Sequence, residues 1–339
     1  MDLSIVIPAY NVESHIEICL KSLLNQNIDS SRYEIIVVND GSTDATESIV
    51  RGLIAEHGNI KLINQENKGN GGARNRGVDI ACGHYLYFVD ADDYIAANTL
   101  EKILNLAITN DLDIIGFNSK QVTSHSLSKS DNIDEDKPVS VMKGTQFIGK
   151  HNFKPEVWWY FIRRQFYHNC KVTFYHRKFL QDSYITPILF SKAERVVYLN
   201  YDVYRYYMSN NSITRNKSKK HLKTHFKDLA FAIEKQDELI KSIENENKGE
   251  NIDCLKMLKA KKERYVLISI VRYFKSDFSF KELSKDLEIY REKDAYPFRF
   301  FPKVNGFDSL LNRTLVFIFN SKPLLNVSFR SYQLLKKLT

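Results

Sequence analysis

The sequence predicts an α/β fold, with a mainly parallel central sheet flanked by helices and a mostly helical C-terminal region. Apolar runs alternate with helical patterns over the first third of the chain, and the last third is basic with helical spacing. The predicted strands are Leu3–Ala9, Tyr33–Asp40, Ile60–Gln65, Tyr85–Asp90 and Asp113–Phe117. The predicted helices between them are His15–Leu24, Thr43–Ala55, Gly72–Ile80 and Thr99–Thr109. In such a sheet, ligands bind beyond the carboxyl ends of the strands.

The first four predicted strands each lead into polar or special residues. These stretches are, in order, Pro8-Ala9-Tyr10-Asn11, Asn39–Asp44, Asn67–Asn75 and Asp90-Ala91-Asp92-Asp93. Each alone is compatible with ordinary loop chemistry, such as a turn at Asp40-Gly41 or a helix cap at Ser42. Because all four stretches fall at the edge where this architecture binds ligands, together they predict a functional site.

The acidic run after the fourth strand is the best candidate for an active centre. An apolar strand that ends in Asp90, Asp92 and Asp93 places like charges together, which repel one another without a cation. Carboxylates are the ligands that Mg²⁺ and Mn²⁺ prefer, usually shared with substrate phosphates. A solvated acidic turn is the alternative.

The charge distribution separates two parts of the chain. The chain has a net charge of +8. Residues 1–115 contain 8 Lys and Arg and 17 Asp and Glu, whereas residues 116–339 contain 41 Lys and Arg and 24 Asp and Glu. A uniformly basic nucleic-acid binder would not concentrate its acids in one part, so no nucleic-acid partner is expected. An acidic, metal-binding part joined to a basic part suits an enzyme that works on anions such as phosphates or near a membrane surface.

The cysteines and the apolar runs bear on location. Cys19, Cys82, Cys170 and Cys254 lie far apart without a Cys-x-x-Cys pair, which favours reduced thiols over a disulfide or zinc framework. The chain opens without a charged-then-apolar leader, and the apolar run near its end, Leu315–Phe319, is too short to cross a bilayer. We expect a cytoplasmic protein, with the inner face of the cell membrane as a further location.

Two nucleotide-binding motifs are excluded. In Gly69-Asn70-Gly71-Gly72-Ala73-Arg74, an arginine stands where a dinucleotide fingerprint needs its third Gly or Ala, and the stretch follows the third strand instead of the first. A phosphate loop of the G-x-x-x-x-G-K-[ST] type does not occur in the chain.

The strand-end motifs also resemble those of a known family. Ser4–Asn11, Glu34–Asp44, Asn67–Gly77 and Tyr87–Asp93 appear in the order found in the nucleotide-sugar domain of family 2 glycosyltransferases. The motifs cover about the first third of the chain. The resemblance implies the GT-A fold and an inverting, metal-dependent transfer of a sugar from a nucleoside diphosphate, with UDP expected, to an acceptor hydroxyl. Members of the bacterial surface-polysaccharide type act on a glycan or a lipid-linked acceptor.

The resemblance also implies roles for individual residues. The substrate would be bound by Pro8, Ala9, Tyr10, Asn11, Asp40, Asn67, Gly69, Arg74, Asp90, Ala91 and Asp93. Within this set, Asp40 would accept hydrogen bonds from the base and Arg74 would face the nucleotide. Asp90 would contact the ribose or the sugar, and Asp92 would bind Mn²⁺ or Mg²⁺. A surface ion pair is the alternative role for Arg74.

An inverting transfer needs a carboxylate that takes the proton of the acceptor hydroxyl. In the family this is commonly the Asp of a Glu-Asp pair, and the matching stretch here has Gln181 followed by Asp182. Asp182 is therefore the candidate catalytic base, with a helix cap as its alternative role. Asp93 is the substitute candidate for the base.

Two aromatic stretches of the second half match family patterns in part. Trp158 and Trp159 could stack on a sugar or lie in the core. In the motif at Tyr204–Ile213, Tyr207 stands where the family has Arg, so Arg205 is the substitute candidate for diphosphate contact. The polar segment Gln121–Lys137 is expected to be an insertion or hinge.

The C-terminal region is expected to be helical. The predicted helical stretches are Lys217–Lys223, Phe226–Glu244, Ile252–Phe274, Leu310–Phe319 and Leu324–Leu338, with a further apolar stretch at Phe298–Phe301. The last stretches place basic residues beside apolar ones, which suits a helix lying on an anionic membrane. Packing against the protein itself is the equal alternative.

The prediction from sequence is therefore a glycosyltransferase of three parts. Residues 1–117 would bind the nucleotide sugar, residues 118–215 would form the acceptor side with the base, and residues 216–339 would form a basic helical region. A nucleotidyltransferase is one alternative, although it would place a Gly-rich, basic loop directly after the first strand. A non-catalytic nucleotide-sugar-binding module is the other, since Gln181 departs from the family's acidic pair.

Overall fold

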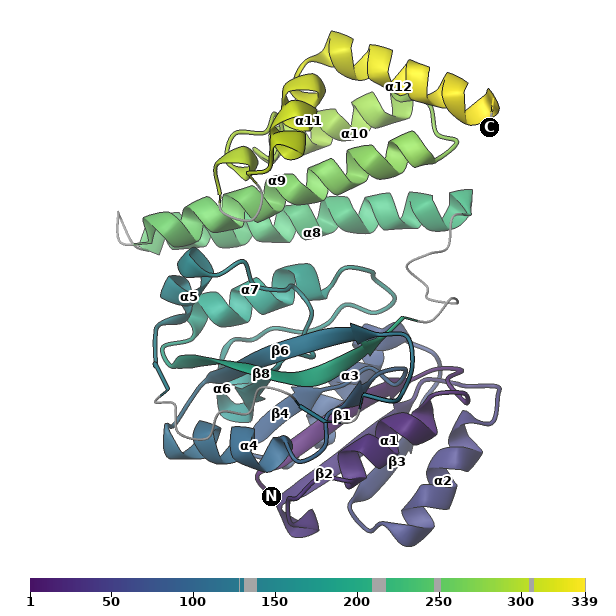
Figure 1. The fold of residues 1–339 in the computed structure, drawn as a ribbon, viewed down its shortest axis with the longest axis vertical. Helices are drawn as coiled ribbons and strands as arrows, with labels where there is room; N and C mark the ends of the chain where they lie inside the picture. The colour runs from purple at the N-terminus through teal and green to yellow at the C-terminus, as the bar shows by residue number, and fades with distance from the viewer. Residues whose placement is uncertain (128, 131–138, 209–217, 247–250, 305–307, 339) are drawn as a thin grey trace. The chain divides into compact units, whose positions relative to one another are not determined.

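A computed structural model describes residues 1–127, 129–130, 139–208, 218–246, 251–304 and 308–338. The chain divides into two compact units, and Figure 1 follows it from the purple N-terminus to the yellow C-terminal helices. The first unit comprises residues 1–144 and 154–212, and the second comprises 145–153 and 213–339. Each unit is described here by itself.

The first unit contains an eight-stranded sheet in the order β3-β2-β1-β4-β7-β6-β8-β5, counted over the described residues. The strands are β1 Leu3–Ala9, β2 Tyr33–Asn39, β3 Ile60–Asn64, β4 Tyr85–Phe88, β5 Tyr94–Ile95, β6 Ile114–Val122, β7 Tyr160–Arg163 and β8 Val196–Tyr207. Strands β1 to β4 pair parallel with one another, as predicted. Both β1 and β2 are buried along their whole length, which explains their continuous apolar sequences.

Strand β7 changes the direction of the sheet. It pairs antiparallel with β4 on one side and with β6 on the other, whereas β8 runs parallel to β6. The mixed α/β fold with helices packed along the sheet confirms the predicted class (Figure 1). The antiparallel strand β7 was not predicted, because the short sequence Tyr160–Arg163 has no pattern that distinguishes antiparallel from parallel pairing.

The helices of the first unit that lie close to the predicted ranges are α1 Ile16–Leu24, α2 Thr46–Glu56, α3 Gly69–Ile80 and α4 Leu100–Thr109. No range was predicted for α6 Arg164–Asn169, α7 Asp182–Lys192 or the 3-10 turn η1 at Ser30–Arg32. Helix α3 begins at Gly69, three residues before the predicted start at Gly72. Its glycine-rich first turn is therefore helical, although glycine costs about 1 kcal/mol per residue in a helix.

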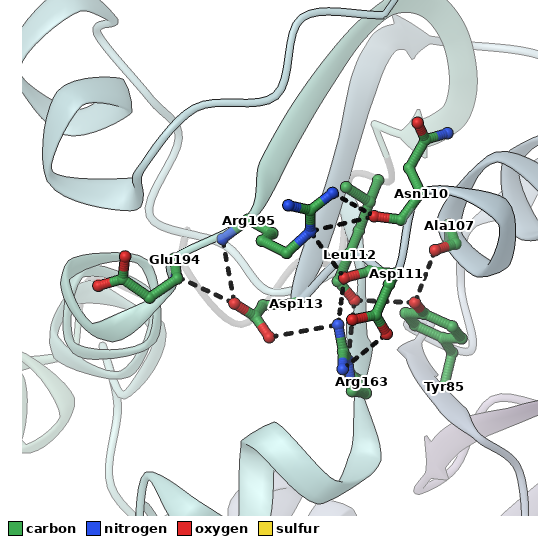
Figure 2. Close-up of polar contacts among 9 residues, drawn as sticks. All are labelled: Tyr85, Ala107, Asn110, Asp111, Leu112, Asp113, Arg163, Glu194 and Arg195. Atoms are coloured by element: carbon green, nitrogen blue, oxygen red, sulfur yellow. Dashed lines mark hydrogen bonds and ion pairs between the residues drawn. The ribbon is translucent and has the colours of Figure 1, made fainter.

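The edge of the sheet where the parallel strands begin is closed by arginines (Figure 2). Arg163, at the end of β7, donates from Nε to the carbonyl oxygen of Leu112 at 3.1 Å and pairs with Asp111 at 2.9 Å. Arg195, just before β8, donates from Nη2 to the carbonyl oxygen of Asn110 at 2.8 Å. Asp113 accepts from the backbone N–H of Arg195 at 3.1 Å. These contacts fix the turn between α4 and β6.

The second unit is helical. It contains most of α5 Gly144–Lys150, then α8 Lys219–Glu246, α9 Ile252–Lys275, α10 Phe280–Glu292, the 3-10 turn η3 Phe301–Lys303, α11 Leu310–Asn320 and α12 Lys322–Leu338. Helices α8 and α9 lie side by side (Figure 1). Between them, the buried Lys262 ammonium pairs with Asp237 at 2.7 Å and donates to the carbonyl oxygen of Lys293 at 2.7 Å.

The sequence prediction of a break between Lys223 and Phe226 was wrong. Helix α8 is continuous there because His225 and Phe226 lie on its buried face and continue the helical spacing toward Leu229. Two predictions fall partly outside the described residues: the helix expected to begin at residue 217, and residues 128 and 131–137 of the expected insertion or hinge. Among the helices that the structure describes, none has the length and apolarity required to cross a membrane.

Candidate active site

The carboxyl ends of β1 and β2 meet at one point of the sheet. The backbone N–H of Asp40, after β2, donates to the carbonyl oxygen of Ala9, at the end of β1, at 2.8 Å. Asp40 is buried, and its Oδ1 accepts from the Gln65 amide at 2.6 Å and from the Lys68 backbone N–H at 2.8 Å. The predicted base-binding carboxylate is therefore held in one orientation by the loop after β3.

The segment after β1 turns outward. Pro8 and Ala9 are buried, whereas the Tyr10 ring is about half exposed. Asn11 adopts a positive φ of 51°, and its Oδ1 accepts from the Thr43 backbone N–H at 2.8 Å. The loops after β1 and β2 are thereby tied together, with Tyr10 accessible to a ligand.

The start of α3 packs closely against a later loop. Gly69 has a φ of +78°, and a Cβ at this position would lie 3.0 Å from the Arg177 backbone. The carbonyl oxygen of Asn67 accepts from Arg177 Nη2 at 2.7 Å, and that of Lys68 accepts from the Arg177 backbone N–H at 3.1 Å. Sequence reasoning missed Arg177, because its contacts are with backbone atoms more than one hundred residues away.

Arg74 brings three of the predicted residues together. It lies on α3 and is only 4% exposed. Its Nη2 donates to Asp90 Oδ1 at 2.8 Å and its Nη1 donates to Asp182 Oδ1 at 3.1 Å. Arg74 Nε is buried without a hydrogen-bond partner among the described residues. The Arg74 side chain is buried and the two carboxylates are 26% and 23% exposed, so this pairing of α3 with the end of β4 and the start of α7 is more buried than a surface ion pair.

Asp182 is the first residue of α7. The residue at the N-cap position of this helix is Gln181, so Asp182 lies one position inside the helix, in its first turn. Burial raises the pKa of Asp182 above the ordinary carboxyl range, while the nearby Arg74 guanidinium opposes this shift. A carboxylate with a raised pKa is better able to accept a proton than a fully solvated one. Its neighbour Gln181 is buried against Gly71.

The carboxylates after β4 differ in their partners. Burial, with the negative charge of Asp90 as the second cause, raises the pKa of Asp92 to about 6. Asp90 is paired with Arg74, whereas the described residues place no basic side chain in an ion pair with Asp92. Ala91 between them is buried. Burial, followed by the negative charges of Asp92 and Asp90, also raises the pKa of Asp93 well above its ordinary value. The repulsion expected from the sequence is therefore present, and it acts on both Asp92 and Asp93.

The oxygen donors at this point fit a hard divalent cation. Asp92 has a raised pKa and no ion-pair partner in the described part of the chain, so a bound Mg²⁺ or Mn²⁺ would relieve its repulsion with Asp90. Within the part of the chain that the structure describes, no three or more His, Cys, Asp or Glu side chains gather as a complete metal cage. Mg²⁺ usually binds one or two carboxylates and completes its shell with water and substrate phosphates.

Asp93 has a different environment from its neighbours. It is buried, its Oδ2 accepts from the Tyr204 hydroxyl at 2.6 Å, and its Oδ1 accepts from the Tyr207 backbone N–H at 2.7 Å. The Tyr204 hydroxyl also accepts from the backbone N–H of Asp90 at 3.2 Å. Both oxygens of Asp93 are thus directed at β8, and Tyr204 links the acidic loop to that strand. The aromatic motif at Tyr204 was the available sequence signal for this link.

The remaining aromatic and basic candidates lie in the core. Trp158 is buried and stacks on Tyr204 with ring centroids 4.3 Å apart, and Trp159 is buried against Phe190. Arg205 is also buried, and its guanidinium donates to Asp202 and to the carbonyl oxygens of Leu127, Lys129, Asp202 and Tyr204. Arg205 is therefore not placed to contact a diphosphate. Residues 209–213 of the matching motif lie outside the described part of the chain.

Residues 4–180 match the family model described as glycosyl transferase family 2. The uncharacterized glycosyltransferase EpsJ of Bacillus subtilis is 34% identical over 217 residues, which is 62% of this chain and 62% of EpsJ. The poly(ribitol-phosphate) beta-glucosyltransferase of Bacillus spizizenii is 35% identical over 216 residues, 60% of this chain and 32% of that protein. The matched stretch thus spans less than two thirds of the length of these relatives.

Solved structures share the fold at low sequence identity. The S. aureus protein TarS superposes with a TM-score of 0.65 and 19% identity, covering 88% of this chain and 49% of TarS. A TarS fragment in complex with UDP-GlcNAc has a TM-score of 0.58 and covers 87% of this chain and 90% of the fragment. The mannosyltransferase PcManGT from Pyrobaculum calidifontis, in complex with GDP-Man and Mn²⁺, has a TM-score of 0.56 and 15% identity. The match covers 97% of this chain and 84% of PcManGT. The fold is therefore the GT-A type.

Proposed function

The chain belongs to glycosyltransferase family 2, since the family model matches residues 4–180, and we propose that it transfers a sugar from a nucleoside diphosphate to an acceptor hydroxyl. The observation that carries the proposal is the buried Arg74, which holds Asp90 and Asp182 at 2.8 Å and 3.1 Å. Asp92 lies beside this pairing with a raised pKa, and no basic side chain of the described residues forms an ion pair with it. A site with an acid–base group next to a carboxylate that could hold a divalent cation suits displacement of a diphosphate, because the cation would stabilise the departing oxygen.

The donor nucleoside would lie over the ends of β1 and β2. We propose that the nucleobase binds to the buried Asp40 and is surrounded by Pro8, Ala9, Tyr10 and Asn11. Asn67 and Gly69 would shape the adjoining loop, where a side chain on Gly69 has no room. UDP is the expected nucleotide from the motif resemblance, and the TarS fragment solved with UDP-GlcNAc supports a uridine nucleotide in this fold.

The diphosphate would face Arg74, with the ribose or the sugar against Asp90 and Ala91. Asp92 would bind Mn²⁺ or Mg²⁺, and such an ion supplies positive charge that stabilises the departing diphosphate oxygen. Asp93 has both oxygens engaged by β8, so we assign it to holding the acidic loop in place.

Asp182 would act as the catalytic base. In an inverting displacement, the acceptor oxygen bonds to the anomeric carbon as the bond from that carbon to the diphosphate breaks, and the hydroxyl proton passes to the Asp182 carboxylate. Arg74 engages Oδ1 of this carboxylate, and a raised pKa favours proton uptake. The same contact orients the carboxylate relative to Asp90.

The acceptor is proposed from the relatives. One of them is named for glucosyl transfer to poly(ribitol-phosphate), so a surface glycan or its lipid-linked precursor is the class that we propose. Such acceptors are made at the cytoplasmic face of a membrane, and we place the enzyme there.

Calorimetry with UDP and Mn²⁺ tests the assignment of the site. We expect the Asp92→Ala variant to lose the metal-dependent part of UDP binding, whereas Asp182→Asn keeps it. Release of UDP from a panel of UDP sugars should be lost in Asp182→Asn, because the proton has no acceptor. Unchanged UDP affinity in Asp92→Ala would refute the metal assignment, and UDP binding without turnover in the wild type on every donor and acceptor would favour a non-catalytic module.

A further inference from the structure

Helix α12 (Lys322–Leu338) presents apolar side chains on two opposite sides. One side packs within the second unit, since Leu325 and Phe329 are buried and the rings of Phe329 and Phe274 lie 5.2 Å apart. On the same side, Lys336 pairs with Asp277 at 2.7 Å. Packing against the protein, one of the two alternatives from sequence, therefore uses only one side of this helix.

The other side of α12 forms an exposed apolar stripe. Its members are 40% to 83% exposed and are Leu324, Val327, Leu334, Leu335 and Leu338. Their spacing of three, seven, one and three residues places them along one face of a helix. Globular proteins seldom leave so many large aliphatic side chains together in water, so this face is expected to have a partner.

The charged residues of α11 and α12 themselves are all positive. Residues 309–339 contain five Lys and Arg and no Asp or Glu. Arg330 lies at the border of the stripe and is exposed, and on the preceding helix α11 the exposed Phe317 accompanies the exposed Arg313. Apolar side chains bordered by cations are typical of a helix that rests at the interface of an anionic bilayer.

A second copy of the chain fits this face less well. Positions 324, 327, 331, 334 and 338 have the spacing of a coiled-coil seam, but Ser331 occupies its middle. The positions that border such a seam include Arg330 and hold no acid, so two copies would bring like charges together without compensation. The charge therefore favours an anionic surface over self-association.

We propose that α12 docks the protein on anionic lipid, with the stripe Leu324, Val327, Leu334, Leu335 and Leu338 entering the interface and Arg330 meeting the headgroups. Docking rests on the proposed function in one respect: it would bring the enzyme to a lipid-linked acceptor. The docking itself needs neither donor nor catalysis.

Co-sedimentation with vesicles, without any sugar donor, tests the docking. We expect the whole chain to bind vesicles of phosphatidylcholine mixed with phosphatidylglycerol, and to bind pure phosphatidylcholine at least about tenfold more weakly. The Val327→Ser/Leu334→Ser variant should lose about a hundredfold in binding, because two exposed aliphatic side chains no longer enter the interface. Arg330→Gln should lose about fivefold, and raised salt should weaken the wild type.

A matched control carries the same chemical change elsewhere in the second unit. Ile252→Ser/Ile289→Ser replaces two exposed aliphatic side chains outside α12 and should bind vesicles as the wild type does. Equal binding of wild type and Val327→Ser/Leu334→Ser overturns the proposal, as does equal binding to neutral and anionic vesicles. An oligomer that the stripe variant converts to a monomer in sedimentation velocity would instead assign the stripe to self-association.

UDP binding by calorimetry separates this proposal from the proposed function. The stripe variant should bind UDP as the wild type does. A protein that binds vesicles but not UDP would refute the proposed function alone, and the reverse result would refute the lipid docking alone.

Discussion

The two edges of the central sheet use the same residue types in opposite ways. Where the parallel strands begin, Arg163 and Arg195 direct guanidinium groups to the carbonyl oxygens of the turn before β6, and Asp113 accepts from backbone N–H groups (Figure 2). Where the strands end, Arg74 directs its donors to two side-chain carboxylates, Asp90 and Asp182.

The difference lies in what the charges compensate. At the first edge, the carboxylates and guanidinium groups form hydrogen bonds with backbone atoms or ion pairs with one another. These charged groups therefore stabilise the conformation of the turn before β6. At the second edge, the carboxylates outnumber the nearby cations, and burial with the charge of Asp90 raises the pKa of Asp92 to about 6. An edge that keeps uncompensated charge at a cost in stability is a candidate for ligand chemistry.

The largest effect is expected at Asp182. Asp182→Asn should lower kcat by about 10³-fold, since a positioned base contributes about 10² to 10⁴. UDP affinity should stay within twofold of the wild type. The matched control, Asp113→Asn at the opposite edge, should leave kcat unchanged; a comparable loss in Asp113→Asn would mean that Asp182 acts through the fold.

Arg74→Gln should destabilise the protein by about 3 kcal/mol. Removing one partner from a buried ion pair leaves the other charge uncompensated, and here two carboxylates, Asp90 and Asp182, lose their cation. Urea denaturation measures the free energy of unfolding. The double variant Arg74→Gln/Asp182→Asn should recover part of the loss, and an additive further loss would contradict the pairing.

Asp92→Asn should stabilise the metal-free protein above pH 6 by about 1 kcal/mol, after allowance for partial exposure. Because the pKa of Asp92 is raised to about 6, the folded state keeps a proton that the unfolded chain releases near its ordinary pKa. Wild-type stability from this group therefore falls as the pH rises from about 4 to about 6.

Thermal unfolding at several pH values measures this difference. The wild type and Asp92→Asn should converge below about pH 3, where the carboxyl is protonated in both the folded and the unfolded state. Added Mn²⁺ should stabilise the wild type and not the variant. A constant difference between the two proteins across this range of pH would contradict the raised pKa.

The smallest effect is expected at the edge of Figure 2. Arg195→Gln should lower the free energy of unfolding by about 1 kcal/mol, because its hydrogen bonds to the carbonyl oxygens of Asn110 and Asp111 are lost. UDP affinity and kcat should not change. A loss of UDP affinity in Arg195→Gln would mean that the two edges are coupled.

The sequence alone predicted strands β1 to β4, the start of β6 and the edge that carries the candidate site, but not β5, β7 or β8. Leu3–Ala9 has the same bounds in the prediction and in the structure, because a strand buried on both faces needs a continuous apolar run. The stretches that contain Asp40, Arg74 and Asp90 were selected because parallel strands bring their carboxyl ends to one edge, and the roles of the individual residues came from the family resemblance.

Only the tertiary structure decided how those residues meet. The pairing of Arg74 with Asp182 joins residues 108 positions apart, and the antiparallel β7 between β4 and β6 has no local signature. The environments of Asp92 and Asp93 differ because of β8. Tyr204 and Tyr207 of this strand donate hydrogen bonds to Asp93, and no described residue of β8 donates one to Asp92. Hydrogen bonding and burial depend on neighbours in space, whereas strand and helix patterns depend on neighbours along the chain.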